Sequence, residues 1–124
     1  MISAKHILDS VSVDDGLRVL VEPAWPKHVG REKAVLNMWL KDLSPSVGLS
    51  KRLADHTLDW EDFVLLYSVE LEKNRDFFPD LQVHNHNGGL TLLHGSPDRD
   101  RNAATALKMI LDDKDRAGSI LRPV

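Results

Sequence analysis

Two runs of apolar residues predict the central strands of a sheet. Residues 17–22 and 90–94 are mostly apolar and lack the regular alternation of polar positions that marks a half-exposed strand. Such runs are typical of parallel sheets that are covered on both faces. The long stretch between them can form the helical crossover that parallel neighbours require. We therefore expect the two runs to be neighbouring parallel strands, and a weaker pattern at 4–8 predicts a third, short strand.

Apolar residues at helical spacing predict helices in the middle of the chain. Between residues 31 and 43 they recur every three or four positions, and Ser44-Pro45 then ends the pattern. The residue before a proline is pushed out of the helical conformation, so the helix is expected to stop there. A short helix is expected at 46–54. A longer helix should begin after Asp59, a good N-cap residue, and end by Pro79.

The last third of the chain is expected to form a turn, a strand and a helix. Residues 84–89 are polar and rich in asparagine and glycine, which predicts a turn. Ser96-Pro97-Asp98 combines a capping serine, a proline suited to the first helical position and an acid, three signals of a helix start. The inner stripe of that helix is expected to consist of Ala103, Ala104, Leu107, Ile110 and Leu111.

This order of elements predicts the α/β class. We expect a single layered domain at 1–115, with a small, mainly parallel β-sheet packed by α-helices, and a C-terminal tail at 116–124. Strand and helix stripes must cover each other in such a domain. The sequence therefore predicts one continuous core that includes Leu20, Trp39, Trp60, Phe63, Tyr67, Leu92 and Leu107.

Composition narrows the class of protein. The chain has 124 residues, enough for one domain, with 42% apolar and 28% charged residues. It contains no cysteine, which excludes disulfides, thiolate zinc sites and cysteine nucleophiles. No apolar run reaches the length of a membrane span, and the first residues lack the apolar core of a signal peptide. We expect a cytoplasmic protein that does not associate with a membrane, and nothing in the sequence indicates its oligomeric state.

The charge pattern argues against nucleic acid as a partner. The formal net charge is −3, whereas a nucleic-acid-binding surface normally shows a basic excess. Basic residues do gather at 27–33 and at 51–52, but acids are interleaved nearby, and we interpret these groups as solvated helix faces. Nucleic-acid association is therefore the weakest of the functions considered.

A candidate site is expected where the two central strands end. Ligands of open parallel sheets sit outside the carboxyl ends of the strands. A helix beginning at Ser96 would also direct backbone amides toward that crevice, which suits a phosphate or a carboxylate. The simpler interpretation is that Ser96 only caps its helix. The residues predicted to line the site are Glu22, Trp25, Lys27, His94, Ser96, Asp98 and Asn102.

Two functions from different classes fit these residues. The first is a binding module for an anionic small molecule or a nucleotide. The second is a hydrolase-like enzyme in which Glu22, His94 and Asp98 supply acid–base chemistry, although carboxylates spaced in this way more often form structural ion pairs. His84 and His86 alternate in a flexible turn with no carboxylate beside them, so we predict no metal site and no cofactor.

Ordered motifs along most of the chain carry a resemblance to a known family. They are Arg18-Val19-Leu20-Val21, Trp25-Pro26-Lys27, Trp39 with Lys41 and Leu43, Pro45-Ser46, Trp60 with Phe63, Tyr67 and Glu70-Leu71, and Thr91-Leu92-Leu93 with Asp98, Asn102, Ala104 and Leu107. With this spacing, residues 16–111 resemble the YeaO-like branch of the domain of unknown function 488 family. The family is labelled as having no known function, so the resemblance assigns no activity.

Several polar positions depart from that family's pattern. Glu22-Pro23 stands where the family has an acid and an arginine, and Lys27-His28 stands where it has an arginine and a glycine. Ser50 and Leu66 each stand where the family has an arginine. His94 stands in place of a tyrosine, and Arg101 in place of a histidine. The apolar pattern of the family is kept here, while several of its charged positions are not.

Overall fold

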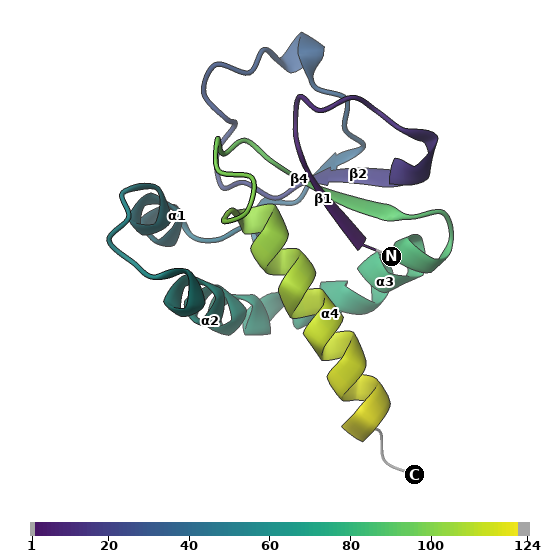
Figure 1. Ribbon diagram of the computed structural model, residues 1–124. Helices are drawn as coiled ribbons and strands as arrows, with labels where there is room; N and C mark the ends of the chain where they lie inside the picture. Colours follow the sequence, from purple (N-terminus) through teal and green to yellow (C-terminus); the bar gives the residue numbers. More distant parts are fainter. Residues whose placement is uncertain (1, 122–124) are drawn as a thin grey trace.

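A parallel sheet forms the centre of the protein. The computed structural model describes the backbone of residues 2–121 and the side chains of residues 2–113. Within that range the sheet has four strands, in the spatial order β1-β4-β2-β3: β1 (Ile2–His6), β2 (Leu17–Leu20), β3 (Met38–Trp39) and β4 (Leu90–His94). Leu17 lies opposite Leu90 and Leu20 opposite Leu93, which confirms that the two apolar runs are parallel neighbours (Figure 1).

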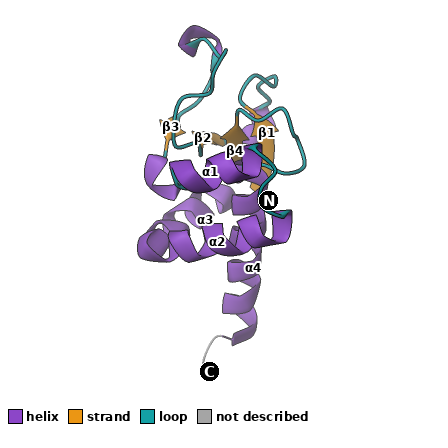
Figure 2. Cartoon of the chain, turned by 90° about the vertical axis from the view of Figure 1, so that its left-hand side faces the viewer, coloured by secondary structure: helices purple, strands orange, loops and turns teal. Residues whose placement is uncertain are grey.

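The helices cover one side of this sheet. They are α1 (Val47–Ala54), α2 (Trp60–Leu71), α3 (Phe78–His86) and α4 (Ala103–Leu121), with short 3-10 turns η1 (Val13–Asp15), η2 (Arg31–Lys33), η3 (Lys41–Leu43) and η4 (Glu72–Phe77). The loop between β2 and β3 covers the other side (Figure 2). The α/β class is confirmed.

Helix α4 also includes part of the predicted tail. Its backbone is helical through residues 116–121, while 122–124 lie outside the described residues. No helix within the described part of the chain is both long and apolar enough to cross a membrane.

Residues 31–43 do not form the helix that their apolar spacing predicts. They form η2, β3 and η3 instead, and β3 pairs with the outer edge of β2. The amide of Asn37 donates to the carbonyl of Arg18 at 2.8 Å, and the amide of Leu40 donates to the carbonyl of Leu20 at 3.0 Å. An open edge of β2 would leave these strand groups unpaired, and that requirement outweighs local spacing. The prediction of a helix here is wrong.

Two other boundaries differ from the prediction. The first strand is Ile2–His6 rather than 4–8. Pro79 stands in the first turn of α3, where its missing N–H costs no helical hydrogen bond, so it helps to begin a helix. The helix expected after Asp59 already ends at Leu71, as α2. Because α3 continues to His86, the polar turn before β4 begins at Asn87 rather than at residue 84.

The core is divided by the sheet into two clusters. The larger cluster, on the helical side, contains Phe63, Tyr67, Leu92 and Leu107, with half-buried Trp60 against it. Leu20 and Trp39 belong to the smaller cluster under the β2–β3 loop. Successive strand residues point to opposite faces, so Leu20 cannot share a face with Val19 or Val21. The prediction of one continuous core is therefore wrong.

A buried ion pair ties three strands of the sheet together. The Arg18 guanidinium donates to the carboxylate of Asp15, and both side chains are almost completely buried. Lys5 of β1 donates to the same carboxylate at 3.0 Å, and the Thr91 hydroxyl of β4 donates to the Asp15 carbonyl at 2.8 Å. Burial alone would raise the pKa of Asp15, but hydrogen bonds from the Ser12 amide, Lys5 and Arg18 hold it below its ordinary value of 3.8.

We predict that Asp15→Asn destabilises the protein by about 3–5 kcal/mol at pH 7, because it leaves the buried guanidinium of Arg18 without a counter-charge. A carboxylate with a lowered pKa in the folded state stabilises fully above its unfolded pKa, and that stabilisation is lost as the pH falls through the folded pKa. The difference between variant and wild type should therefore shrink below about pH 4. Urea unfolding at a series of pH values measures it.

The exposed neighbour Asp14 supplies the matched control, since Asp14→Asn removes the same charge from solvent. It should unfold like the wild type. Equal stability of the two variants at pH 7 would contradict the role given to the buried pair.

Candidate functional site

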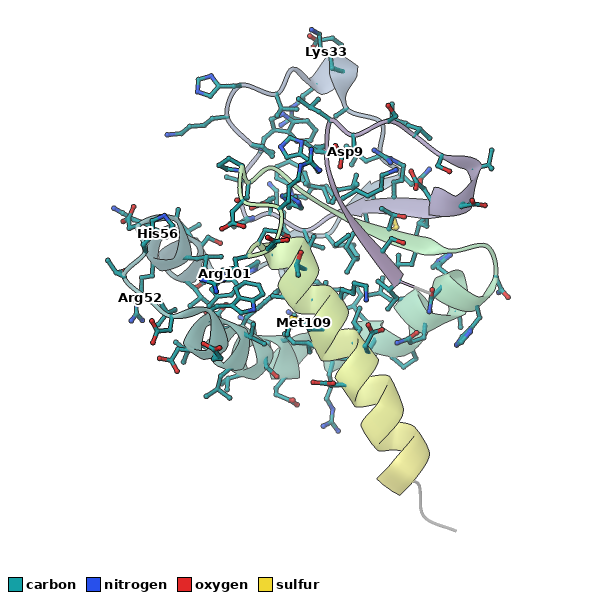
Figure 3. All side chains as sticks on the ribbon, viewed as in Figure 1. Asp9, Lys33, Arg52, His56, Arg101 and Met109 are labelled. Carbon is teal, nitrogen blue, oxygen red and sulfur yellow. The ribbon has the colours of Figure 1, made fainter. Side chains whose placement is uncertain are left out.

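A cavity of about 820 Å³ opens at the carboxyl ends of β2 and β4. This volume lies in the upper part of the range typical of small-molecule sites. One wall comes from the segments that follow the two strands, and the other from α1, the α1–α2 loop and the start of α2. Figure 3 shows His56 beyond the end of α1 and Arg101 before α4; both residues line the cavity.

Contacts with α2 fix the position of α1, which forms the outer wall. The Ser46 hydroxyl donates to the Glu70 carboxylate at 2.6 Å, and the Ser46 amide donates to its other oxygen at 2.8 Å. The same hydroxyl accepts from the amide of Leu49, which caps α1. The buried Tyr67 hydroxyl donates to the carbonyl of Leu43, just before this turn. Both ends of the segment that leads into α1 are thereby attached to α2.

The backbone at the end of α1 directs His56 to the cavity. The amide of Thr57 donates to the carbonyl of Arg52 at 3.0 Å, and that of His56 donates to the carbonyl of Leu53 at 3.2 Å. This is a Schellman ending, which places one residue in the left-handed region, and His56 occupies it with φ 58°. Glycine is usual there, and another residue costs about 1–2 kcal/mol. The strain brings an imidazole, rather than a bare backbone, to the cavity wall.

Glu22 is the half-buried carboxyl group of the cavity. Its Oε1 accepts a hydrogen bond from the Gly95 amide at 3.1 Å, and no lysine or arginine forms an ion pair with it among residues 2–113. Burial raises the pKa of Glu22, and the Gly95 hydrogen bond offsets only part of that rise. A carboxyl group of this kind can accept a hydrogen bond from a ligand or act as a proton donor.

The loop after β4 forms a turn, not the helix start that the sequence predicts. The Asp98 carboxylate accepts from the amides of Asp100 and Arg101, at 2.9 and 3.0 Å, and holds the chain in that turn. These two amides are the main reason why the pKa of Asp98 lies below its ordinary value, with smaller effects from the charges of Arg101 and His56. The Ser96 hydroxyl accepts from the amide of Asp98. Helix α4 begins only at Ala103.

Of the predicted site residues, four line the cavity and three do not. The four are Glu22, Lys27, Ser96 and Asp98. Trp25 lies under the β2–β3 loop instead, where its Nε1 donates to the carbonyl of Val29 at 2.7 Å. Asn102 is buried and caps α4 by accepting from the amide of Thr105 at 2.8 Å.

His94 is also buried outside the cavity lining. Its Nδ1 accepts from the Ser96 amide at 3.1 Å, and its ring meets that of His6 edge-on with centroids 5.4 Å apart. Burial, with a smaller effect from His6, lowers the pKa of His94 to about 4, so the ring is neutral at pH 7. His84 and His86 lie on α3, before the amino end of β4, and neither lines the cavity.

Sequence reasoning missed the wall contributed by α1 and α2. The residues on it are Ser50, Lys51, Leu53, Ala54, His56, Leu58, Asp59, Trp60 and Glu61, and Arg101 was missed on the opposite side. Nothing local marks most of these positions, because they face the cavity only after α1 has docked on α2. Lys51 and Arg101 could have been considered as cations from the sequence. At position 56 a histidine stands where a glycine would usually signal the left-handed conformation.

Comparison with known proteins identifies the relatives of the chain. The family described as "Inactive DUF488-N3 subclade" matches residues 1–119. YeaO, an uncharacterised protein of Escherichia coli strain K12, is 28% identical over 106 residues, which cover 86% of this chain and 92% of that protein. An uncharacterised protein of Mycobacterium tuberculosis strain H37Rv is 29% identical over 66 residues, 53% of this chain and 56% of the relative. No solved structure is significantly similar to the chain.

We predict that His94 makes the protein less stable in mild acid. Because its folded pKa is depressed, the unfolded chain binds the proton first, so stability falls as the pH drops from the ordinary value of 6.5 to about 4. The loss attributable to this group should reach up to about 3 kcal/mol. In His94→Asn, the side-chain oxygen of the asparagine can still accept a hydrogen bond from the Ser96 amide. The free energy of unfolding in urea should then no longer show the part of its pH dependence that is due to His94.

The exposed His86 provides the control, because His86→Asn removes a solvated imidazole from the end of α3. That variant should keep the full slope between pH 6.5 and 4. The assignment is wrong if His94→Asn keeps the slope too.

Proposed function

Because the chain belongs to the Inactive DUF488-N3 subclade, we propose that it binds an anionic small molecule, such as a nucleotide, without converting it. The cavity at the carboxyl ends of β2 and β4 is the proposed site. The observation that carries the proposal is a pair of cations, Lys27 and Arg101, which line the cavity from different loops. Neither forms an ion pair with a carboxylate among residues 2–113.

Among the other lining residues, which also include the acids Asp59, Glu61 and Asp98, an apolar group supports a ligand that carries a ring system. Leu53, Leu58 and Trp60 offer an apolar surface on the α1–α2 side, large enough for a ring system. The half-buried carboxyl of Glu22 can accept a hydrogen bond from an N–H or O–H of the ligand. A nucleotide has all three features, namely a planar ring, donor groups and a phosphate.

In this proposal the anion is held by side chains, not by a helix end. The Gly95 amide already donates to Glu22, and the Ser96 amide to His94. The Asp98 amide donates to the Ser96 hydroxyl. Those of Asp100 and Arg101 donate to the Asp98 carboxylate. Asn102 caps α4. Because α4 begins at Ala103, Ser96 offers no helix start to an anion, and Lys27 and Arg101 supply the positive charge instead.

Departures from the family pattern support binding rather than catalysis. Three of the departures line the cavity. Lys27 and Ser50 each replace an arginine of the family, and Arg101 replaces a histidine. By contrast, matched positions such as Ser46, Tyr67 and Glu70 make structural hydrogen bonds around it. Catalysis is more sensitive than binding to the identity of the polar groups at a site. A cavity that has lost its catalytic polar groups can therefore keep the shape that binds a ligand.

A hydrolase-like enzyme is the second candidate, and one observation favours it. Glu22 combines a cavity position with a raised pKa, which is typical of a general acid. His94, which the sequence predicts to join Glu22 and Asp98 in acid–base chemistry, does not line the cavity. The acid–base pair would therefore have to be Glu22 with Asp98 or His56.

The chain contains no cysteine from which disulfides could form, so the proposal places the protein in the cytoplasm.

Thermal unfolding with nucleoside 5′-monophosphates and the matching nucleosides tests the proposal. A monophosphate present at about 100 times its Kd should stabilise the protein by about 2.7 kcal/mol, which raises Tm by several degrees. The nucleosides should stabilise much less, because they lack the group that Lys27 and Arg101 bind. Product analysis of the same mixtures should show no turnover.

Matched double variants assign the effect to the cavity. Lys27→Ala with Arg101→Ala should lose most of the stabilisation by monophosphates. Arg52→Ala with Lys73→Ala removes one lysine and one arginine from exposed positions outside the lining, and should keep it. Equal responses of the two double variants, or no response of the wild type to any nucleotide, would overturn the proposal. Turnover that Glu22→Gln abolishes would favour the enzyme instead.

A further inference from the structure

The β2–β3 loop concentrates positive charge on the side of the sheet away from the helices. Residues 23–41 carry four cations, Lys27, Arg31, Lys33 and Lys41, and a single acid, Glu32. This segment therefore has a formal charge of +3, while the whole chain has −3 and the remaining residues together have −6. The net charge of the chain conceals this separation.

The four cations of the loop are available to a partner. All four residues are exposed, and none forms an ion pair with a carboxylate among the side chains that the structure describes. The sequence interpretation as a solvated helix face does not apply, because no α-helix forms there. The loop projects away from the helical layer, and Lys33 lies at its tip (Figures 2 and 3).

Two tryptophans lie between these cations. The rings of Trp25 and Trp39 meet edge-on with centroids 5.5 Å apart, and both are half-buried. The Arg31 guanidinium lies 4.6 Å from the centroid of Trp25 and 5.6 Å from that of Trp39. The Lys41 ammonium lies 4.2 Å from the centroid of Trp39. Two of the four cations, Arg31 and Lys41, thus lie directly against the indole rings.

We propose that this surface, the basic loop formed by Trp25, Lys27, Arg31, Lys33, Trp39 and Lys41, binds single-stranded nucleic acid. Lysines neutralise the phosphates, and indole rings and a guanidinium plane provide surfaces on which unpaired bases stack. Duplex bases are not available for stacking, and no described α-helix lies in this loop to enter a groove. An acidic polypeptide would use the charges but not the planar groups between them.

The basic loop is distinct from the cavity proposed above. Lys27 is shared by both, because it lines the cavity and begins the loop. Arg31, Lys33 and Lys41 do not line the cavity. Variants at Arg31 and Lys33 therefore test the loop without touching the proposed small-molecule site.

Fluorescence anisotropy of labelled oligo(U) and oligo(dT), each of about 12 nucleotides, tests the proposal on the full chain. We expect binding at low salt that weakens steeply as salt is added, together with quenching of tryptophan fluorescence. Arg31→Gln with Lys33→Gln should weaken binding at least tenfold and reduce the slope of log K against log salt by up to about 1.4. Arg52→Gln with Lys73→Gln, the matched control, should bind like the wild type. Preference for one oligonucleotide would identify the sugar that the surface favours.

Four results would overturn the proposal. The first is no binding of either oligonucleotide at low salt. The second is equal loss in the two double variants, which would indicate a general charge effect. The third is competition by polyglutamate as strong as that by unlabelled oligonucleotide, which would assign the surface to acidic polypeptides. Adenosine 5′-monophosphate serves as a separate competitor: if it displaces the oligonucleotide, the cavity rather than the loop holds the strand, and the assignment to the loop is wrong.

Discussion

The buried ion pair between Asp15 and Arg18 is the interaction on which the rest of the sheet depends. Lys5, from β1, adds a second cation to the Asp15 carboxylate, and Thr91, from β4, binds its carbonyl. The Arg18 Nε also donates to the carbonyl of Val35 at 2.7 Å, which draws the β2–β3 loop to the same place. A buried pair of this kind adds little net stability compared with apolar side chains, but losing one partner is costly. Its effect is therefore to fix which strands lie side by side. A more exposed ion pair between Asp9, after β1, and Arg99, after β4, adds a second tie at the carboxyl ends.

Glycine at two positions allows this arrangement to close. Gly16 has φ 62°, and a Cβ there would lie 2.1 Å from the carbonyl oxygen of Gly89, which accepts a hydrogen bond from the Leu17 amide at 3.0 Å. No other residue could let β2 and β4 begin so close together. The cavity lies at the opposite ends of these strands, where α1 and the loop after β4 surround it. The residues that close the sheet and those that line the cavity are thus separate sets, and the lining can change without loss of the fold.

This separation explains which features the sequence could predict. Composition alone identifies β2 and β4, because a strand covered on both faces must be apolar throughout. The prediction for residues 31–43 is wrong because their apolar spacing fits a helix, while the deciding factor, the unpaired edge of β2, lies in a strand that precedes them in the sequence. Ser96 was misread for a similar reason, since the Asp98 side chain captures two amides that a helix would have used. His56 could not be found at all, because a histidine in a left-handed conformation carries no local signal. Local patterns predicted the central elements, and tertiary hydrogen bonds decided the rest.

The connection between β2 and β3 links the fold to the distribution of charge. Parallel neighbours are usually joined by a helix, which would bring its own acids and i,i+4 ion pairs to the surface. Here the crossover is a loop held down by Trp25 and Trp39, so its cations are not offset by carboxylates of a helix. The net negative charge is left to the rest of the chain, including the exposed acids at the start of α2. Such a separation produces a field that attracts a polyanion to the loop and repels it from the helical side. Lys27 stands where the loop meets the cavity, so it belongs to both of the surfaces that are proposed to bind anions.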